Sequence, residues 1–185
     1  MSASLSNKLD NSRQETLWVL RAQCGDREAL ELLLRHVQPA LHRYLRGLVG
    51  PTDADDVLQE VLVLVFRKLK WLESPELLRP WVFRIASRAA LRHGKRASRW
   101  QAVDDAMLES APAPDVRPPE ELLQRLEDRD AISPASRAVL LLHFKEDLSL
   151  PEVAAILDLP LGTVKSRLSY GLATLRKHLD RRRSL

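Results

Sequence analysis

The sequence predicts an all-α protein in which two small helical domains are joined by a flexible linker, the C-terminal domain containing a helix-turn-helix. Apolar residues recur at helical spacing along most of the chain, and we find no convincing strand and no internal repeat. Proline, alanine, serine and acidic residues interrupt this pattern over about residues 98–119. The length of 185 residues gives room for one ordinary domain or two small ones.

The N-terminal part divides into helices at residues that end or begin them. Gly25 ends a first helix, and Asp26 is a good N-cap for a second. Pro39 is expected to start a third helix, which the pair Gly50-Pro51 closes. The apolar positions of these helices are Leu17, Leu20 and Ala22, then Ala29, Leu30, Leu33 and Val37, then Leu41, Tyr44, Leu45 and Leu48.

The strongest amphipathic pattern covers about residues 53–70. Its apolar residues follow i, i+3, i+4 spacing, and this outweighs the strand propensity of the β-branched run at Val61: Val57, Leu58, Val61, Leu62, Val65, Phe66 and Leu69. Pro80 suits the first turn of a further helix. That helix carries Trp81, Val82, Ile85, Ala86 and Ala89.

Helical spacing resumes at Glu120, and near the C-terminus a tight turn separates two helices. Ser149 and Glu152 have the spacing of a capping box at the start of the first. Residues 158–160 end that helix, since aspartate tolerates a left-handed backbone, and a second begins near Gly162-Thr163. The second helix has an apolar stripe of Val164, Leu168, Leu172 and Leu175. Its expected outer face and flank hold Thr163, Lys165, Ser166, Arg167, Ser169 and Tyr170.

This pattern favours a helix-turn-helix that binds DNA over an ordinary helical hairpin. A helix that enters the major groove needs polar and basic side chains on its outer face, which neutralise phosphates or contact base edges. Charge alone leaves both interpretations open, because solvated helix faces are often basic. The chain has a net charge of +4. Its basic residues gather in residues 84–99 and after Leu161, while the charged residues of 104–130 are mainly acidic. Two separated basic segments suggest two contacts with a polyanion.

Other classes of protein lack their sequence signals. The longest apolar run, residues 61–66, is far too short to span a bilayer, and residues 1–11 lack the apolar stretch of a signal peptide. Cys24 is the only cysteine, so an intrachain disulfide and a cysteine-built zinc site are impossible. The histidines are scattered and no glycine-rich phosphate loop occurs. We therefore expect a cytoplasmic protein that is not an enzyme, with no membrane insertion, metal, cofactor or catalytic residue.

Three segments resemble signatures of the sigma-70 family of bacterial transcription initiation factors, specifically the extracytoplasmic-function group. Residues 53–61, DADDVLQEV, resemble region 2.2, and residues 80–86, PWVFRIA, resemble the helix of regions 2.3 to 2.4. Residues 159–168, LPLGTVKSRL, resemble the region 4 recognition helix. Each match alone is modest evidence, but the three occur in family order with a linker in the expected place.

The resemblance implies a factor that binds core RNA polymerase and directs it to specific promoter DNA. Residues 14–99 would form sigma region 2, which binds the polymerase and opens the promoter at the minus-10 element. Residues 100–119 would be the linker, and residues 120–185 would form sigma region 4, which recognises the minus-35 element. An anti-sigma factor is a further partner that the family often has.

The resemblance also implies three sets of site residues. The polymerase-binding set is Asp53, Asp55, Asp56, Gln59 and Glu60, although acids at a helix N-terminus are also favoured by the helix dipole. The minus-10 set is Lys70, Trp71, Arg84, Arg88 and Arg92, in which the tryptophan would stack on an extruded base and the arginines would track phosphates. The minus-35 set is the outer face of the second helix, listed above. Two departures from the family stand out: Asp158 replaces a common glycine, and residues 169–171 interrupt a stretch that is often basic.

Two rival interpretations keep the helical fold and change the function. A sigma-like decoy would bind an anti-sigma factor without initiating transcription, and it could lose its DNA-contacting side chains. A plain helix-turn-helix repressor would not need the acids of residues 53–60. Transcription in vitro with core polymerase separates the three, because only a sigma factor would give a promoter-specific transcript.

Overall fold

The computed structural model describes residues 2–93, 118, 120–124, 126 and 132–183, and the regular structure in these ranges is helical throughout, which confirms the predicted fold class. The expected linker, residues 100–119, lies outside the described residues except for Pro118. The N-terminal part holds α1 (Ser2–Gln23), α2 (Arg27–Val49), α3 (Pro51–Lys68), the 3₁₀ turns η1 (Leu69–Trp71) and η2 (Pro75–Leu77), and α4 (Leu78–His93). The C-terminal part holds α6 (Glu120–Gln124), α7 (Pro134–Leu140), the π-helical turn η4 (Leu141–Lys145), α8 (Leu150–Leu157) and α9 (Leu161–Arg183).

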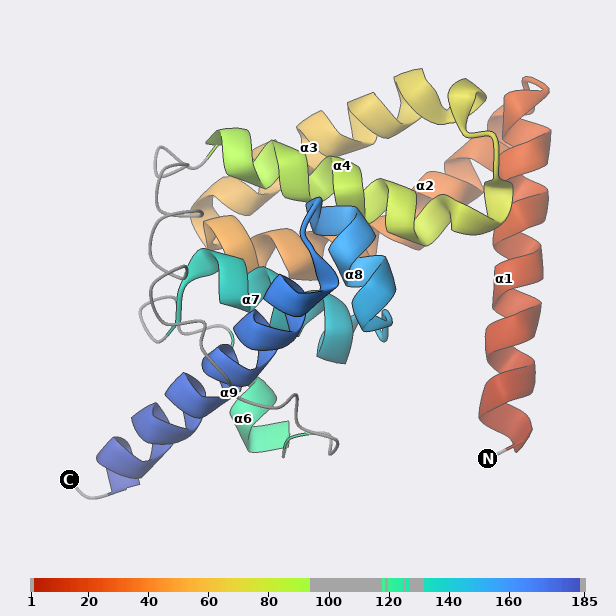
Figure 1. Cartoon of the computed structure of the whole chain (residues 1–185). Coiled ribbons are helices and arrows are strands. Elements are labelled where there is room, and N and C mark those ends of the chain that lie inside the picture. Colours follow the sequence, from red (N-terminus) through yellow and green to blue (C-terminus); the bar gives the residue numbers. More distant parts are fainter. Residues whose placement is uncertain (1, 94–117, 119, 125, 127–131, 184–185) are drawn as a thin grey trace.

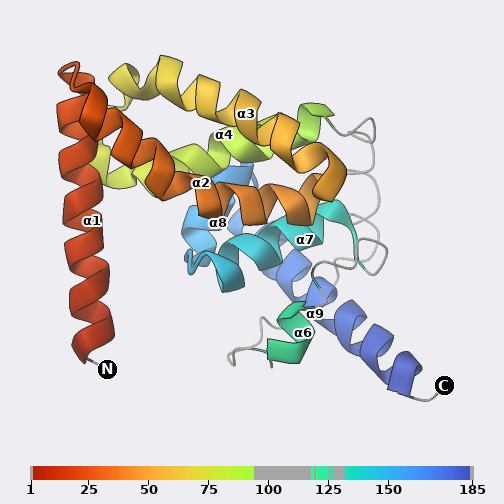
Figure 2. The same cartoon turned by 180° about the vertical axis from the view of Figure 1, so that it is seen from behind.

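The two parts pack against each other. α2, α3 and α4 lie side by side, and α1 crosses one end of this group (Figure 1). The C-terminal helices cover one face of it, with α8 against α4 and α7 against α2 (Figure 2). Buried apolar residues of both parts form one continuous cluster. None of the helices in the described ranges is long and apolar enough to cross a bilayer.

α2 runs unbroken through Pro39, so the prediction that a new helix begins there is wrong. Proline lacks the N–H that would bond to the carbonyl of Arg35, which costs roughly 3 kcal/mol in a helix interior. Buried residues on both sides of the proline form one stripe: Ala29, Leu33, Val37, Leu41, Tyr44, Leu45 and Leu48. Burial of this stripe against neighbouring helices outweighs the missing hydrogen bond. The predicted cap is confirmed, since the Asp26 carboxylate accepts from the Ala29 N–H at 3.0 Å.

α1 buries different residues from those that marked it in the sequence. Leu17 and Leu20 are each 48% exposed, whereas Glu15 and Val19 are buried. The Glu15 carboxylate lies 2.8 Å from Nε2 of His36 on α2. This hydrogen bond compensates for burying a carboxylate, and α1 therefore turns its Glu15 side toward α2.

A buried hydrogen-bond chain fixes α4 against α2. The Ser87 hydroxyl donates to the Phe83 carbonyl at 2.8 Å, so the Tyr44 hydroxyl, 2.7 Å away, donates to the Ser87 oxygen. Burial raises the pKa of the Tyr44 hydroxyl above its ordinary value, which keeps it a donor. The chain sets the rotation of α4 and hence the direction in which its arginines point.

Two glycines allow close approach between helices. A Cβ on Gly47 of α2 would lie 2.6 Å from Cδ1 of Leu141, across the contact between the two parts. A Cβ on Gly171 of α9 would lie 2.8 Å from Cδ1 of Leu140 and 3.3 Å from Cβ of Ser136 on α7. The loss of helix propensity at Gly171, about 1 kcal/mol relative to alanine, is thus offset by tighter packing of α9 on α7.

We predict that Gly171→Leu lowers the free energy of unfolding by about 1–3 kcal/mol, because the new side chain overpacks the contact between α9 and α7. Gly162→Leu is the matched control on the same helix, since nothing lies within 4 Å of its added Cβ. The control should equal or exceed the wild type in stability. Urea unfolding followed by circular dichroism measures both, and equal stability of the two variants would contradict the close packing.

We predict that Ser87→Ala costs more stability than Tyr44→Phe. The first change leaves the buried Tyr44 hydroxyl without its acceptor and should cost about 1–3 kcal/mol. The second leaves Ser87 bonded to the Phe83 carbonyl and should cost about 0.5–1.5 kcal/mol. Urea unfolding of the two single variants and the double variant checks the order, and the double variant should recover part of the loss of Ser87→Ala.

Candidate nucleic-acid and protein interfaces

The predicted polymerase-binding residues lie together along α3, and three of its acids contact basic side chains of neighbouring helices. Each contact joins α3 to α2 or α4 at the surface: Asp53 to His93 at 3.4 Å, Asp55 to His42 at 3.0 Å, and Glu60 to Arg92 at 2.7 Å. Asp56 and Gln59 are exposed. The acids therefore form a surface cluster that is partly neutralised from within the domain.

An apolar groove lies beside these acids, between α2 and α3. Phe66, which belongs to the predicted apolar stripe, is 58% exposed, and Val63 is 42% exposed. The groove is lined by Leu34, Gln38, Asp55, Leu58, Gln59, Leu62, Val63 and Phe66. An adjoining hollow is lined by Asp56, Gln59, Glu60, Val63, Leu64 and Arg67. The signal in the sequence was the width of the apolar stripe of α3, which is broader than α2 and α4 can cover.

The predicted minus-10 residues Lys70 and Trp71 form an exposed pair in η1. The Trp71 side chain is 65% exposed, and Nζ of Lys70 lies 4.3 Å from the centroid of its ring. Gln23 of α1 holds this turn in place by donating to the carbonyls of Leu69 and Leu72 at 2.9 and 2.8 Å. The turn thus presents an aromatic face and a positive charge from a fixed backbone.

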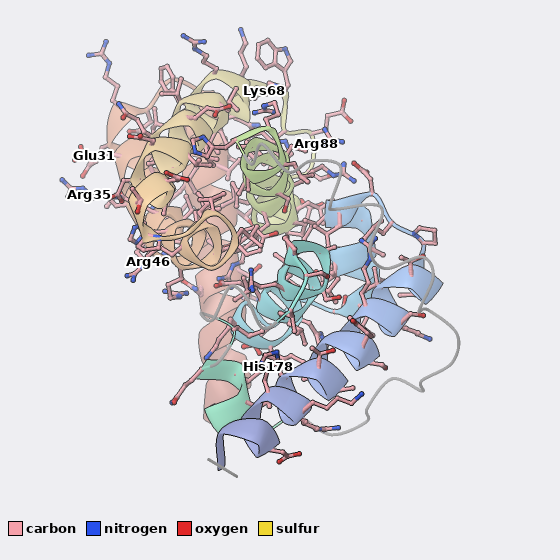
Figure 3. The ribbon with its side chains drawn as sticks, turned by 90° about the vertical axis from the view of Figure 1, so that its left-hand side faces the viewer. Glu31, Arg35, Arg46, Lys68, Arg88 and His178 are labelled. Atoms are coloured by element: carbon pink, nitrogen blue, oxygen red, sulfur yellow. The ribbon has the colours of Figure 1, made fainter. Side chains whose placement is uncertain are left out.

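The arginines predicted on α4 share one face, as expected, and each has a partner in this structure. Arg84 donates to the Ala155 carbonyl of α8, at 2.5 Å from Nη2 and 3.2 Å from Nε. Arg88 donates to the Asp158 carboxylate at 2.8 Å, and Figure 3 shows its side chain on the side of α4 near α8. Arg92 pairs with Glu60. The hydrogen bond from Arg88 holds the pKa of Asp158 below its ordinary value.

A second group of charges bridges α2, α4 and the C-terminal part. The Glu146 side chain, which ends η4, is 2% exposed and lies 3.5 Å from Arg43 and 4.0 Å from Arg79. Burial raises the pKa of Glu146, and the two arginines act in the opposite direction. Nothing in the sequence singled out this contact, because its members are far apart along the chain.

The predicted helix-turn-helix is present as α8 and α9. The Glu152 carboxylate accepts from the Ser149 N–H at 2.8 Å, and the Ser149 hydroxyl accepts from the Glu152 N–H at 3.4 Å, which confirms the capping box. Asp158 has the left-handed backbone that was predicted, with φ of 54°. The apolar stripe of α9 is buried as expected.

The expected outer face of α9 needs correction at two positions. Arg167 and Ser169 are only 5% and 6% exposed, whereas Lys165 is exposed and Thr163, Ser166 and Tyr170 are half-buried. Arg167 follows the buried Val164 by one helical turn and precedes the buried Gly171 by another, so it borders the packed stripe. α6, α7 and α8 all pack on α9 and leave a narrower polar face than the sequence suggested.

The described residues contain no group of three or more histidine, cysteine, aspartate or glutamate side chains placed to hold a metal ion. The surfaces that the structure does bring together are an acidic and apolar face on α2 and α3, an aromatic and basic turn at η1, and a basic face on α4 and α9. Their chemistry is that of binding a protein and a polyanion.

Comparison with known proteins agrees with this arrangement. The family described as Sigma-70 region 2 matches residues 33–100, and Sigma-70, region 4, matches residues 130–177. The ECF RNA polymerase sigma-E factor of Escherichia coli K12 is 30% identical over 164 residues, covering 81% of this chain and 86% of that protein. The sigma-E factor of Haemophilus influenzae is 29% identical over the same length, covering 87% of that protein.

A solved structure is similar over most of the fold. It is described as the structure of CnrH in complex with the cytosolic domain of CnrY, with a TM-score of 0.66 and 25% identity, and the match covers 90% of this chain and 97% of that chain. Both helical parts, their order along the chain and their separate family matches lead to one conclusion: this protein is an RNA polymerase sigma factor and belongs to the extracytoplasmic-function group of the sigma-70 family.

Proposed function

We propose that residues 14–99 of this sigma factor bind core RNA polymerase and the minus-10 element, and that residues 120–185 bind the minus-35 element. The family matches to region 2 and region 4 fall within or close to these two ranges and support the division. The observation that carries the proposal is the segregation of surfaces: acids and exposed apolar side chains on the groove side of α3, basic and aromatic ones on η1, α4 and the start of α9.

The groove between α2 and α3 is the proposed polymerase site. An exposed apolar floor beside carboxylates suits a partner helix or hairpin that presents apolar and basic side chains together. Asp56, Gln59 and Glu60 border the floor, with Asp53 and Asp55 at the start of α3. The C-terminal helices α7 and α8 pack against α2 and α4, and α3 lies above them in Figure 2. Phe66 and Val63 in the groove are exposed, so this surface is open to a partner.

The proposed minus-10 site combines η1 with α4. Trp71 offers an exposed ring on which an unpaired base can stack, and Lys70 adds a positive charge beside it. Arg84, Arg88 and Arg92 would bind phosphates along α4 once their present partners are displaced. The proposed minus-35 site is the start of α9, with Lys165, Thr163, Ser166 and Tyr170 at the surface and Arg167 and Ser169 at its edge.

The solved relative supports a further protein partner. CnrH was solved with the cytosolic domain of CnrY, and we propose a protein partner for this chain as well, an anti-sigma factor that binds its helical domains. Promoter-specific transcription by the purified protein with core polymerase tests the overall proposal against the decoy and repressor alternatives. A decoy or repressor would give no such transcript.

Charge reversal at the start of α3 tests the polymerase site. Asp55→Lys/Asp56→Lys should abolish binding to core polymerase, because it places two cations where the groove presents acids. Glu73→Lys/Glu76→Lys makes the same charge change at exposed residues outside both hollows and should bind as the wild type does. Co-elution with core polymerase in gel filtration measures binding, and retained binding by the first variant would refute this site.

Lys165→Ala tests the minus-35 site. Loss of one phosphate contact should weaken holoenzyme binding to minus-35 duplex DNA and reduce the slope of log K against log salt by about 0.9. Lys177→Ala, exposed about three turns further along α9, is the control that should leave the slope unchanged. Fluorescence anisotropy over a salt series measures both slopes, and an unchanged slope for Lys165→Ala would remove this lysine from the interface.

A further inference from the structure

Two carboxylates of the C-terminal domain contact arginines of the N-terminal domain. Asp158 lies 2.8 Å from Arg88 and 3.6 Å from Arg84, and Glu146 lies 3.5 Å from Arg43 and 4.0 Å from Arg79. These four ion pairs have the same polarity, with the acid on the C-terminal side each time. The polarity matters because the proposed DNA-binding residues of α4 are among the arginines.

The backbone at Asp158 gives no local reason for a carboxylate. Its φ of 54° and ψ of 46° place it in the left-handed region, where glycine is unstrained and asparagine is tolerated as well as aspartate. Its N–H already ends α8 by donating to the Ala154 carbonyl. The charge is used in the contact across the domains.

The C-terminal end of α8 offers arginine the same chemistry as a phosphate. Besides the Asp158 carboxylate, it presents the Ala155 carbonyl, one of the last four that a helix leaves without an internal partner, and Arg84 donates to it. The dipole of α8 adds negative potential at this end. Arg84 and Arg88 therefore have their hydrogen-bonding groups directed at protein oxygens.

We propose that Asp158 and Glu146 form an ionic latch that holds the two domains closed and keeps Arg84 and Arg88 from DNA in the free sigma factor. The closed contact has an apolar part as well, where Leu141 packs on Gly47. The proposal has two halves. The occlusion half, that the latch keeps these arginines from DNA, rests on the proposed minus-10 role of α4. The closure half, that the latch holds the domains together, does not depend on that role.

The separation of the promoter elements requires the latch to open. Minus-10 and minus-35 elements lie about 25 base pairs apart, roughly 85 Å at about 3.4 Å per base pair. In this structure α4 and α8 are in contact, so the two domains cannot occupy both elements at once.

The latch is weak enough to open. Arg88 and Asp158 are 55% and 58% exposed, so their ion pair adds a modest share to the stability of the closed state, beside the apolar contact of Leu141, and is screened by salt. Glu146 is buried, but its arginines lie 3.5 and 4.0 Å away rather than in close hydrogen-bonding contact. A strongly charged DNA can therefore compete with the carboxylates of the closed state.

Energy transfer between two dyes tests closure in the full chain. One dye goes on the exposed Cys24 after α1, and the other on a cysteine introduced by Ala173→Cys at an exposed position of α9. Asp158→Asn and Asp158→Gly should lower transfer efficiency, the second without straining the backbone. Gly47→Leu should also lower the transfer efficiency, because the new side chain displaces Leu141 from the contact between the domains. The substitution should leave α2 intact, since leucine is a better helix former than glycine.

Glu31→Gln is the matched control for Asp158→Asn. It makes the same change in net charge but removes a carboxylate that pairs with Arg35 within α2. Figure 3 shows both side chains on the side of the molecule away from α8. Its transfer efficiency should equal that of the wild type, and thermal unfolding of each variant checks that the domains stay folded. Wild-type transfer in Asp158→Asn would overturn the ionic latch, whether or not Gly47→Leu lowers the transfer.

Binding of a mixed-sequence single-stranded oligonucleotide by the free chain tests occlusion. Asp158→Asn should bind about three- to tenfold more tightly than Glu31→Gln in low salt, because opening releases Arg84 and Arg88. Equal affinity of the two, with transfer efficiency reduced, would overturn the occlusion half and count against a DNA role for these arginines. Promoter-specific transcription with core polymerase tests the proposed function separately, so a failed latch and a failed function give different results.

Discussion

α2 packs against α1, α3 and α4 of its own domain and against α7 and η4 of the other, so burial of its apolar stripe positions both the groove beside α3 and the arginine face of α4. The stripe continues past Pro39, and a helix broken there would leave Tyr44 and the residues around it without a defined position. Tyr44 in turn holds α4 through Ser87. The groove beside α3 and the arginine face of α4 are thus both positioned by one side of one helix.

Local signals predicted the elements well where they depend on neighbouring residues. The cap at Asp26, the capping box of Ser149 and Glu152 and the left-handed turn at Asp158 are each decided within about four residues, and each is present. The prediction that a new helix begins at Pro39 was wrong, because the outcome there depends on residues distant in sequence. The local cost of the proline is real, but the burial that outweighs it involves helices more than thirty residues away in sequence.

The exposure of the site residues was harder to predict, because it depends on how helices pack on each other. The periodicity of α9 places Arg167 outside the apolar stripe, yet three helices pack on α9 and bury it. Phe66 shows the converse: it continues the apolar stripe of α3 and is exposed because no helix covers that side. A one-dimensional pattern gives the direction of a side chain, whereas its exposure also depends on the shape and place of partners distant in sequence.

In the closed structure one proposed surface is exposed and another is already occupied by protein groups, and this difference implies an order of binding. The groove between α2 and α3 is open, and its exposed apolar residues are available to a partner at no cost in intramolecular contacts. Arg84 and Arg88, by contrast, must first leave the end of α8 before they can bind phosphates. Polymerase can therefore engage the closed chain directly, whereas DNA has to displace the Asp158 carboxylate and the Ala155 carbonyl from these arginines. Because the polymerase site does not overlap the latch, polymerase can bind while the domains are closed, and promoter DNA would then open them by drawing Arg84 and Arg88 away from the end of α8.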